Sequence, residues 1–89
     1  MEVSQAYPNP ALVAVRFNLM GACPLAVTWE VYSTAYRRMY SETVLLNGVR
    51  TVVWDLKDFK GSRVANGAYH VRFTAKELGT QVRSVMVLR

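Results

Sequence analysis

The residues that could carry chemistry are few and lie far apart in this sequence. Cys23 and His70 are its single cysteine and single histidine. Nucleophilic catalysis needs a base within hydrogen-bond reach of the nucleophile, whereas Cys23 falls in a predicted turn and His70 on the outward face of a predicted strand. One Cys and one His also cannot form an internal disulfide or supply the ligands of a zinc site. We therefore expect a loop thiol and a solvated histidine.

The acidic residues of one loop are weak candidates for a cation site. Asp55 and Asp58 share that loop, and Glu42 is a further ligand to consider. Calcium takes about six or more oxygen ligands, and Lys57 and Lys60 alternate with the two aspartates. We expect a capped, solvated turn, and no metal.

Other carboxylates do not suggest hydrolysis either. A glycosidase needs two carboxyl groups that flank one cleft, and Glu30, Glu42 and Glu77 are scattered along the chain. No glycine-rich stretch joins a strand to a helix, so the sequence lacks a phosphate loop. We expect no catalytic residue, no cofactor and no enzymatic activity.

Composition bounds the kind of protein. The chain has 89 residues, a net charge of +5, 52% apolar residues and 19% charged ones, which predicts one folded domain over residues 1–89. No segment approaches the ~20 uncharged apolar residues of a membrane helix, and the N-terminus lacks the layout of a signal peptide. The chain is then either cytosolic or a piece whose targeting information lies elsewhere, without membrane insertion.

Alternating apolar and polar residues predict the elements that position these side chains. The predicted strands cover residues 3–7, 13–19, 25–31, 38–41, 51–54, 69–75 and 81–89. Turn signals stand between them at residues 8–10, 21–24, 47–48, 58–61, 66–67 and 79–80. Six or seven short strands at this spacing indicate an all-β fold, an antiparallel immunoglobulin-like β-sandwich.

Several blocks together resemble a known family. They are Tyr7-Pro8-Asn9-Pro10, Val31-Tyr32, Val53-Trp54-Asp55, Gly61, Val64-Ala65-Asn66-Gly67-Ala68-Tyr69 and Val85-Met86-Val87-Leu88-Arg89. In this order they resemble the immunoglobulin-like domain named after the flagellar hook-capping protein, and they are similar to the C-terminal sorting domain of type IX secretion. The resemblance implies a bacterial exported setting, extracellular, cell-surface or periplasmic. In that setting such domains end larger proteins as spacers, assembly contacts or sorting signals.

The residues of these blocks have structural interpretations. Trp54 points inward by alternation and fills a small core, while the Asp55 carboxylate accepts backbone N–H groups of its loop. Tyr69 starts a strand with its hydroxyl free to bond loop backbone, as in a tyrosine corner. The remaining structural residues are those that restrict or extend the backbone at turns, namely Pro8, Asn9, Pro10, Gly61 and Gly67.

The sequence departs from the family pattern on its loops. Ser33 and Tyr36 stand where the family tends to carry an acidic residue and then Gly, and Leu56 and Phe59 replace a small residue and an acidic one. Aromatic and Met side chains that so small a domain cannot bury mark partner surfaces. We therefore expect partner contact through Tyr32, Tyr36, Met39, Tyr40 and Phe59.

The predicted function is a non-catalytic β-sandwich accessory module. It would dock to a protein partner, either a neighbouring domain or another subunit of an extracellular or envelope assembly. An alternative is a small basic domain that binds nucleic acid through Tyr36, Arg37, Arg38 and Tyr40, which the dispersed charge disfavours. Edge strands of a small sandwich invite pairing with another sheet, which leaves self-association open.

Overall fold

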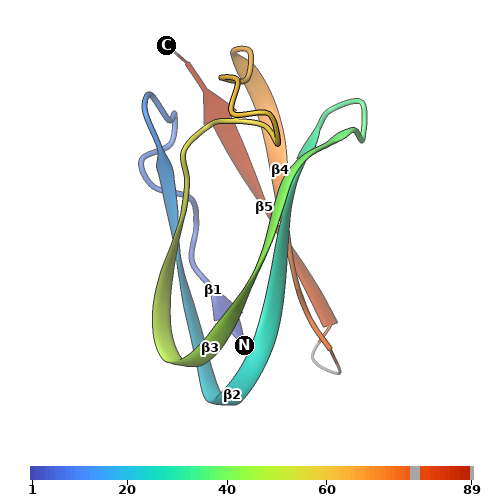
Figure 1. The fold of residues 1–89 in the computed structure, drawn as a ribbon. Helices are drawn as coiled ribbons and strands as arrows, with labels where there is room; N and C mark the ends of the chain where they lie inside the picture. The colour runs from blue at the N-terminus through green and yellow to red at the C-terminus, as the bar shows by residue number, and fades with distance from the viewer. Residues whose placement is uncertain (77–78, 89) are drawn as a thin grey trace.

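Five strands form one antiparallel sheet. A computed structural model describes residues 1–76 and 79–88, without the side chains of Ala22 and Cys23. Its elements are β1 (Glu2–Val3), β2 (Val15–Ser33), β3 (Arg38–Trp54), β4 (Gly67–Ala75) and β5 (Gly79–Val87), and this part of the chain contains no helix (Figure 1). The strand order is β1-β2-β4-β5, with β3 paired to β2. The all-β, antiparallel prediction is confirmed; six or seven separate strands in an immunoglobulin-type sandwich are not.

The strand count is lower because two predicted pairs of strands are continuous. The predicted strands 13–19 and 25–31 lie in β2, and 38–41 and 51–54 lie in β3. β2 and β3 pair from Val15–Trp54 to Tyr32–Arg38, and their register shifts beyond Gly21–Gly48. At this point both strands bend together, so that the hairpin folds over on itself (Figure 1). Two turn signals that face each other thus produce a shared bend instead of two chain reversals.

The bend depends on small residues on both strands. A Cβ on Gly21 would lie 3.0 Å from the Leu46 Cδ2 atom and 3.3 Å from the Leu25 Cδ2 atom. Gly48, its cross-strand partner, has a φ of 86°, which residues other than glycine rarely adopt. Both glycines therefore allow the ladder to resume after the bend.

The N-terminal segment closes the curled sheet. The predicted opening strand 3–7 is reduced to Glu2–Val3 and an isolated bridge between Tyr7 and Arg16. Ala11 then forms a parallel bridge to Val87, and its N–H donates to the Met86 carbonyl at 2.6 Å. Residues near the start of the chain therefore contact the last strand.

The core lies inside the curled sheet. Its buried aromatic residues include Trp29, Trp54, Phe17 and Phe73, and the two phenylalanine rings pack edge to face with centroids 5.0 Å apart. Residues 55–66 cross the open end of the sheet (Figure 1), and their Leu56 is 1% exposed. Leu56 departs from the family pattern on a loop, as Phe59 does, but its side chain completes the core and is not available to a partner.

Candidate functional site

The described residues that were considered for catalysis or metal binding do not form a cluster. In the described part of the chain, no group of three or more His, Cys, Asp or Glu side chains could hold a metal ion. His70 is half-buried on β4. The Cys23 side chain and Glu77 lie outside the described residues.

The acidic loop residues bind their own backbone. The Asp55 Oδ1 atom accepts the Lys57 N–H at 3.2 Å. The Asp58 Oδ1 atom accepts the N–H groups of Lys60 and Ser62 at 2.9 and 3.0 Å. These carboxylates cap a turn, which is the arrangement that short acidic side chains favour in loops.

Trp54 and Tyr69 lie together beneath this loop. The Trp54 indole is 1% exposed and donates from Nε1 to the Lys57 carbonyl at 3.0 Å. The Tyr69 ring lies edge to face against it, with centroids 5.5 Å apart. The Tyr69 hydroxyl donates to the Ala65 carbonyl at 2.7 Å, as a tyrosine corner does. Together these contacts hold residues 55–66 against the core.

The other residues expected to be structural lie at backbone contacts and turns. Asn9, between Pro8 and Pro10, accepts the Met86 N–H at its Oδ1 atom at 2.9 Å. Gly61 and Gly67 have φ angles of 81° and 150°, where a side chain would strain the backbone. These residues position the loop and the N-terminal segment, and they offer no reactive group.

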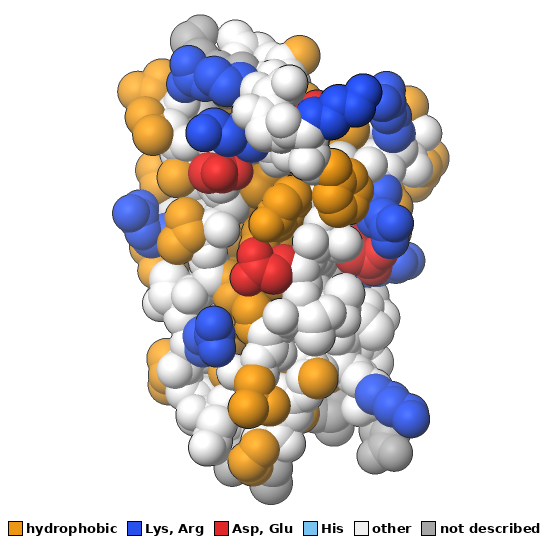
Figure 2. Space-filling model, in the orientation of Figure 1, with side chains coloured by type: hydrophobic (Ala, Val, Ile, Leu, Met, Phe, Trp, Pro, Cys, Tyr) orange, Lys and Arg blue, Asp and Glu red, His pale blue; other side chains and the backbone are white. Residues whose placement is uncertain are grey.

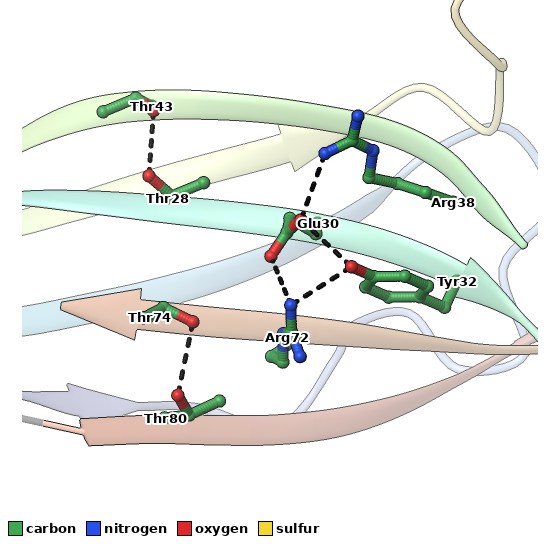
Figure 3. A network of polar contacts seen from close by, with 8 residues as sticks. All are labelled: Thr28, Glu30, Tyr32, Arg38, Thr43, Arg72, Thr74 and Thr80. Atoms are coloured by element: carbon green, nitrogen blue, oxygen red, sulfur yellow. Dashed lines mark hydrogen bonds and ion pairs between the residues drawn. The ribbon is translucent and has the colours of Figure 1, made fainter. Parts of the chain in front are cut away.

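A charge network covers the outer face of the sheet above the buried Trp29. Glu30 on β2 accepts from Arg72 on β4 at 2.9 Å and from Arg38 on β3 at 3.4 Å (Figure 3). The Tyr32 hydroxyl donates to Glu30 at 3.0 Å, and Arg72 donates to that hydroxyl at 3.1 Å. The Arg72 guanidinium also lies 5.2 Å from the centre of the Tyr32 ring. Three strands are thereby joined by one carboxylate.

The network shifts the protonation of its members. The hydrogen bond from Arg72 lowers the pKa of Glu30, in spite of the opposing effect of burial. The same hydrogen bond raises the pKa of Arg72. Glu30 therefore carries its negative charge in the folded state, and it neutralises part of the charge of two arginines.

A groove adjoins the network at the end of the sheet that carries the β2–β3 turn. It has a volume of about 310 Å³ and is lined by Tyr32, Tyr36, His70, Arg72 and Val82. Val82 on β5 is 51% exposed and stands opposite Arg72 in the β4–β5 ladder. Apolar and aromatic walls beside a charged group are typical of a small binding site.

Tyr36 has the most unusual backbone of these residues. Its φ is 60° and its side chain is 85% exposed. The turn that holds it is closed by the Tyr36 N–H, which donates to the Ser33 carbonyl at 3.0 Å, and by the Arg37 N–H, which donates to the Ser33 Oγ atom at 3.2 Å. This is the position at which the resembled family tends to carry Gly. A left-handed conformation costs an ordinary residue roughly 1–2 kcal/mol.

Three of the five expected contact residues lie together at the margin of the core. The Tyr40 ring packs against Trp29 and Phe59, with centroid distances of 5.4 and 5.7 Å. The Phe59 N–H donates to the Met39 carbonyl at 3.0 Å, and Met39 and Tyr40 are only partly exposed. Burial and the nearby Glu42 carboxylate raise the pKa of Tyr40. Phe59 remains 56% exposed.

The expected contact residues therefore occupy two neighbouring places. Tyr32 and Tyr36 line the groove, whereas Met39, Tyr40 and Phe59 cover the side of the core. Arg38 connects the two, because its guanidinium lies 5.6 Å from the Phe59 ring centre and also contacts Glu30. We call Tyr36 and the residues that line the groove with it the groove surface.

The residues predicted for nucleic-acid binding are not presented as one platform. Lys and Arg side chains gather at the end of the molecule that carries the β2–β3 turn and residues 55–66 (Figure 2). Arg38 is engaged by Glu30 and Phe59, and Tyr40 by Trp29 and Phe59. Stacking of successive bases needs aromatic faces free for the ligand, so the structure disfavours this alternative.

Sequence reasoning missed Arg72, His70 and Val82 as members of the groove surface, and Glu30 as the residue that holds Arg72. The alternation along residues 69–75 does place His70 and Arg72 on one outward face. Val82 belongs to the outward face of the last strand. What the pattern lacks is the pairing of β4 with both β2 and β5, which brings these residues beside Tyr32.

Two solved structures share this fold. A crystal structure of dimeric latent PorU from Porphyromonas gingivalis matches with a TM-score of 0.78 and 23% identity, over 93% of this chain and 9% of that one. PorZ of the same organism, described as an essential bacterial surface component of the type-IX secretion system, matches with a TM-score of 0.71 and 22% identity, over 94% of this chain and 11% of that one.

These matches establish a shared fold, and the chain spans about a tenth of either neighbour. No family model and no curated protein matches the chain. The resemblance to the hook-capping domain is therefore not confirmed, whereas type IX secretion is named in one of the structural neighbours. In the described residues, no helix has the length and apolar character needed to cross a membrane.

Proposed function

We propose that this domain is a non-catalytic accessory module that docks through its groove surface to a protein partner in an extracellular or cell-envelope assembly. Tyr36 carries the proposal. Its side chain is 85% exposed and its φ is 60°, so it contributes little to folding and imposes a cost on the backbone. A strained residue with an exposed aromatic side chain beside a groove has a functional explanation when it has no structural one.

The chemistry of the groove suits a side chain of another protein. Tyr32 and Val82 offer apolar contact, and Arg72 offers hydrogen-bond donors next to them. Because Glu30 already holds Arg72 and the Tyr32 hydroxyl in place, little side-chain freedom is lost on binding. An apolar or aromatic side chain of the partner would fill such a site at small entropic cost.

The structural neighbours support the proposed setting. PorZ is described as a bacterial surface component of a secretion system, and in it a domain of this fold occupies a small share of a longer chain. A role in assembly or surface sorting of a larger exported protein, in the periplasm or at the cell surface, is consistent with that arrangement.

The proposal predicts opposite effects of one substitution on stability and on docking. Tyr36→Gly relieves the left-handed backbone, so the free energy of unfolding should rise by up to about 1 kcal/mol in urea titrations. Docking should be lost. Docking is measured in the producing cells by light-induced cross-linking from a photoreactive amino acid at position 82. This residue should yield one discrete protein adduct when Tyr36 is present. It should yield no adduct in the Tyr36→Gly variant.

A matched control uses Leu12, another exposed apolar loop residue at 57% exposure. A photoreactive residue at position 12 should yield no adduct, and Leu12→Ser should leave the adduct from position 82 intact. A nuclease-sensitive adduct would support the nucleic-acid alternative, and the same adduct in the presence and absence of Tyr36 would contradict the assigned surface.

A further inference from the structure

Among the described residues, no strand pairs with the outer edge of β3. In this part of the chain β3 pairs with β2, and it lies in front of β2 in Figure 1. Free edges present rows of N–H and C=O groups that can pair with another chain. Proteins commonly cover such edges. The hydrogen bonds of the described residues show which part of the β3 edge is covered.

The hydrogen bonds of β2 show which groups of β3 point outward. The Arg16 N–H donates to the Tyr7 carbonyl at 2.8 Å, and the Asn18 carbonyl accepts the Ser4 N–H at 2.9 Å, so Arg16 and Asn18 face the N-terminal segment. Their neighbours Val15, Phe17 and Leu19 therefore face β3, opposite Trp54, Val52 and Arg50. It follows that the main-chain groups of Val49, Thr51 and Val53 point away from the sheet.

In the hydrogen bonds of the described residues, this edge is partly covered between residues 38 and 46 and uncovered between residues 49 and 53. Between residues 38 and 46, the Met39 carbonyl accepts the Phe59 N–H, and the Leu45 carbonyl accepts from the Arg50 guanidinium at 3.1 Å. Between residues 49 and 53, the hydrogen bonds of the described residues include none to an outward main-chain group. The side chains there are also exposed, with Val49 at 68% and Val53 at 47%. This part is an uncovered edge without Pro or Lys.

We propose that residues 49–53 of β3 pair antiparallel with the same residues of a second copy of this chain. A two-fold axis at Thr51 places Val49 opposite Val53 of the second copy, and Thr51 opposite Thr51. All three residues have outward main-chain groups, so this register alone satisfies them in both copies. Thr–Thr and β-branched pairs are favourable across antiparallel strands.

The charges also permit this pairing. In the same register Arg50 lies opposite Val52, so no like charges face each other across the new ladder. The Arg50 side chain is already directed to the Leu45 carbonyl. Each copy carries a net charge of +5, which opposes association at long range. Added salt should therefore strengthen the dimer, in contrast to binding of an acidic partner, which salt weakens.

Cysteine cross-linking tests the register directly. In a Cys23→Ser background, Thr51→Cys should give a disulfide dimer under mild oxidation, because hydrogen-bonded antiparallel pairs have Cα atoms about 5.5 Å apart, within the range a disulfide spans. Thr43→Cys is the matched control. Thr43 is also an exposed threonine of β3, and its hydroxyl contacts Thr28 on β2 as that of Thr51 contacts Asn18. It should give at least tenfold less dimer.

Sedimentation of the unmodified 89-residue chain supplies the second measurement. The apparent mass should approach twice that of the monomer with rising concentration and with added salt, and Val53→Lys should keep it monomeric with an unchanged melting temperature. A folded chain that stays monomeric under all of these conditions would overturn the proposal. So would equal cross-linking at positions 43 and 51, which would indicate random collision. These outcomes do not depend on the groove surface, and the Tyr36 experiment does not depend on the edge.

Discussion

Trp29 and Trp54 are each 1% exposed, yet their surroundings differ in one respect. The Trp54 Nε1 atom donates to the Lys57 carbonyl at 3.0 Å, whereas the Trp29 Nε1 atom is buried and has no hydrogen-bond partner among the described residues. Burial alone would rank them as equal. The indole N–H distinguishes the two residues: Trp54 uses it to bind a loop carbonyl, whereas Trp29 contributes through the packing of its ring.

The difference matches what lies above each ring. Trp54 and Tyr69 hold residues 55–66 over the open end of the sheet, through hydrogen bonds to two loop carbonyls. Trp29 lies under the charge network and supports Tyr40, which in turn contacts Phe59. One tryptophan therefore organises a closure of the core, and the other supports a surface.

Removal of either indole ring should have the largest effect on the free energy of unfolding. Trp54→Ala and Trp29→Ala should each lower the free energy of unfolding by about 3–5 kcal/mol, since both leave a large cavity in a tightly packed core. Urea unfolding followed by circular dichroism measures both. If one of the two variants lowered the free energy of unfolding by less than about 1 kcal/mol, the two tryptophans would not contribute equally, contrary to what their equal burial implies.

Replacement by phenylalanine should separate the two sites. Trp54→Phe also leaves the Lys57 carbonyl without its donor, while Trp29→Phe removes a buried N–H that has no partner among the described residues. Trp54→Phe should therefore cost about 1 kcal/mol more than Trp29→Phe in the same urea titrations. Tyr69→Phe is the control, because it removes a hydrogen bond to the same loop without changing either indole. A larger cost at Trp29 would contradict the comparison.

Acidification should produce the smallest effect, confined to the surface above Trp29. Because the pKa of Glu30 is lowered in the folded state, its contribution is present above the ordinary glutamate pKa of about 4.3 and is lost as pH falls through the folded value. Glu30→Gln should lower the free energy of unfolding at pH 7 by no more than about 1 kcal/mol. The gap to the unsubstituted chain should close as the pH falls below about 4. A gap that persists at low pH would show that packing, not charge, explains the effect.

How much of the site could be predicted depended on how local its geometry is. Tyr36 and Phe59 could be recognised as exposed aromatic residues, since both stand on loops where the sequence departs from a family pattern. Leu56 carries the same local signals and is buried, because its φ of 62° and the hydrogen bond from the Val64 N–H to its carbonyl turn it into the core. Local sequence does not distinguish buried Leu56 from the exposed aromatic residues. The difference arises because residues 55–66 cross the open end of the sheet (Figure 1), where Leu56 meets the core.

Alternation in the sequence was sufficient to establish that the protein is all-β. It also established that one strand face carries Val27, Trp29 and Val31 and the other carries Thr28 and Glu30. Both follow because the side-chain period of a strand is a local property of the backbone. Only the tertiary structure decided that the glycines at 21 and 48 face each other and bend two long strands. It also decided that Arg72 and Arg38 converge on Glu30, and that among the described residues no strand pairs with the outer edge of β3. Each of these depends on pairing between residues distant in sequence, which is set by how the sheet curls around its core and not by any one segment.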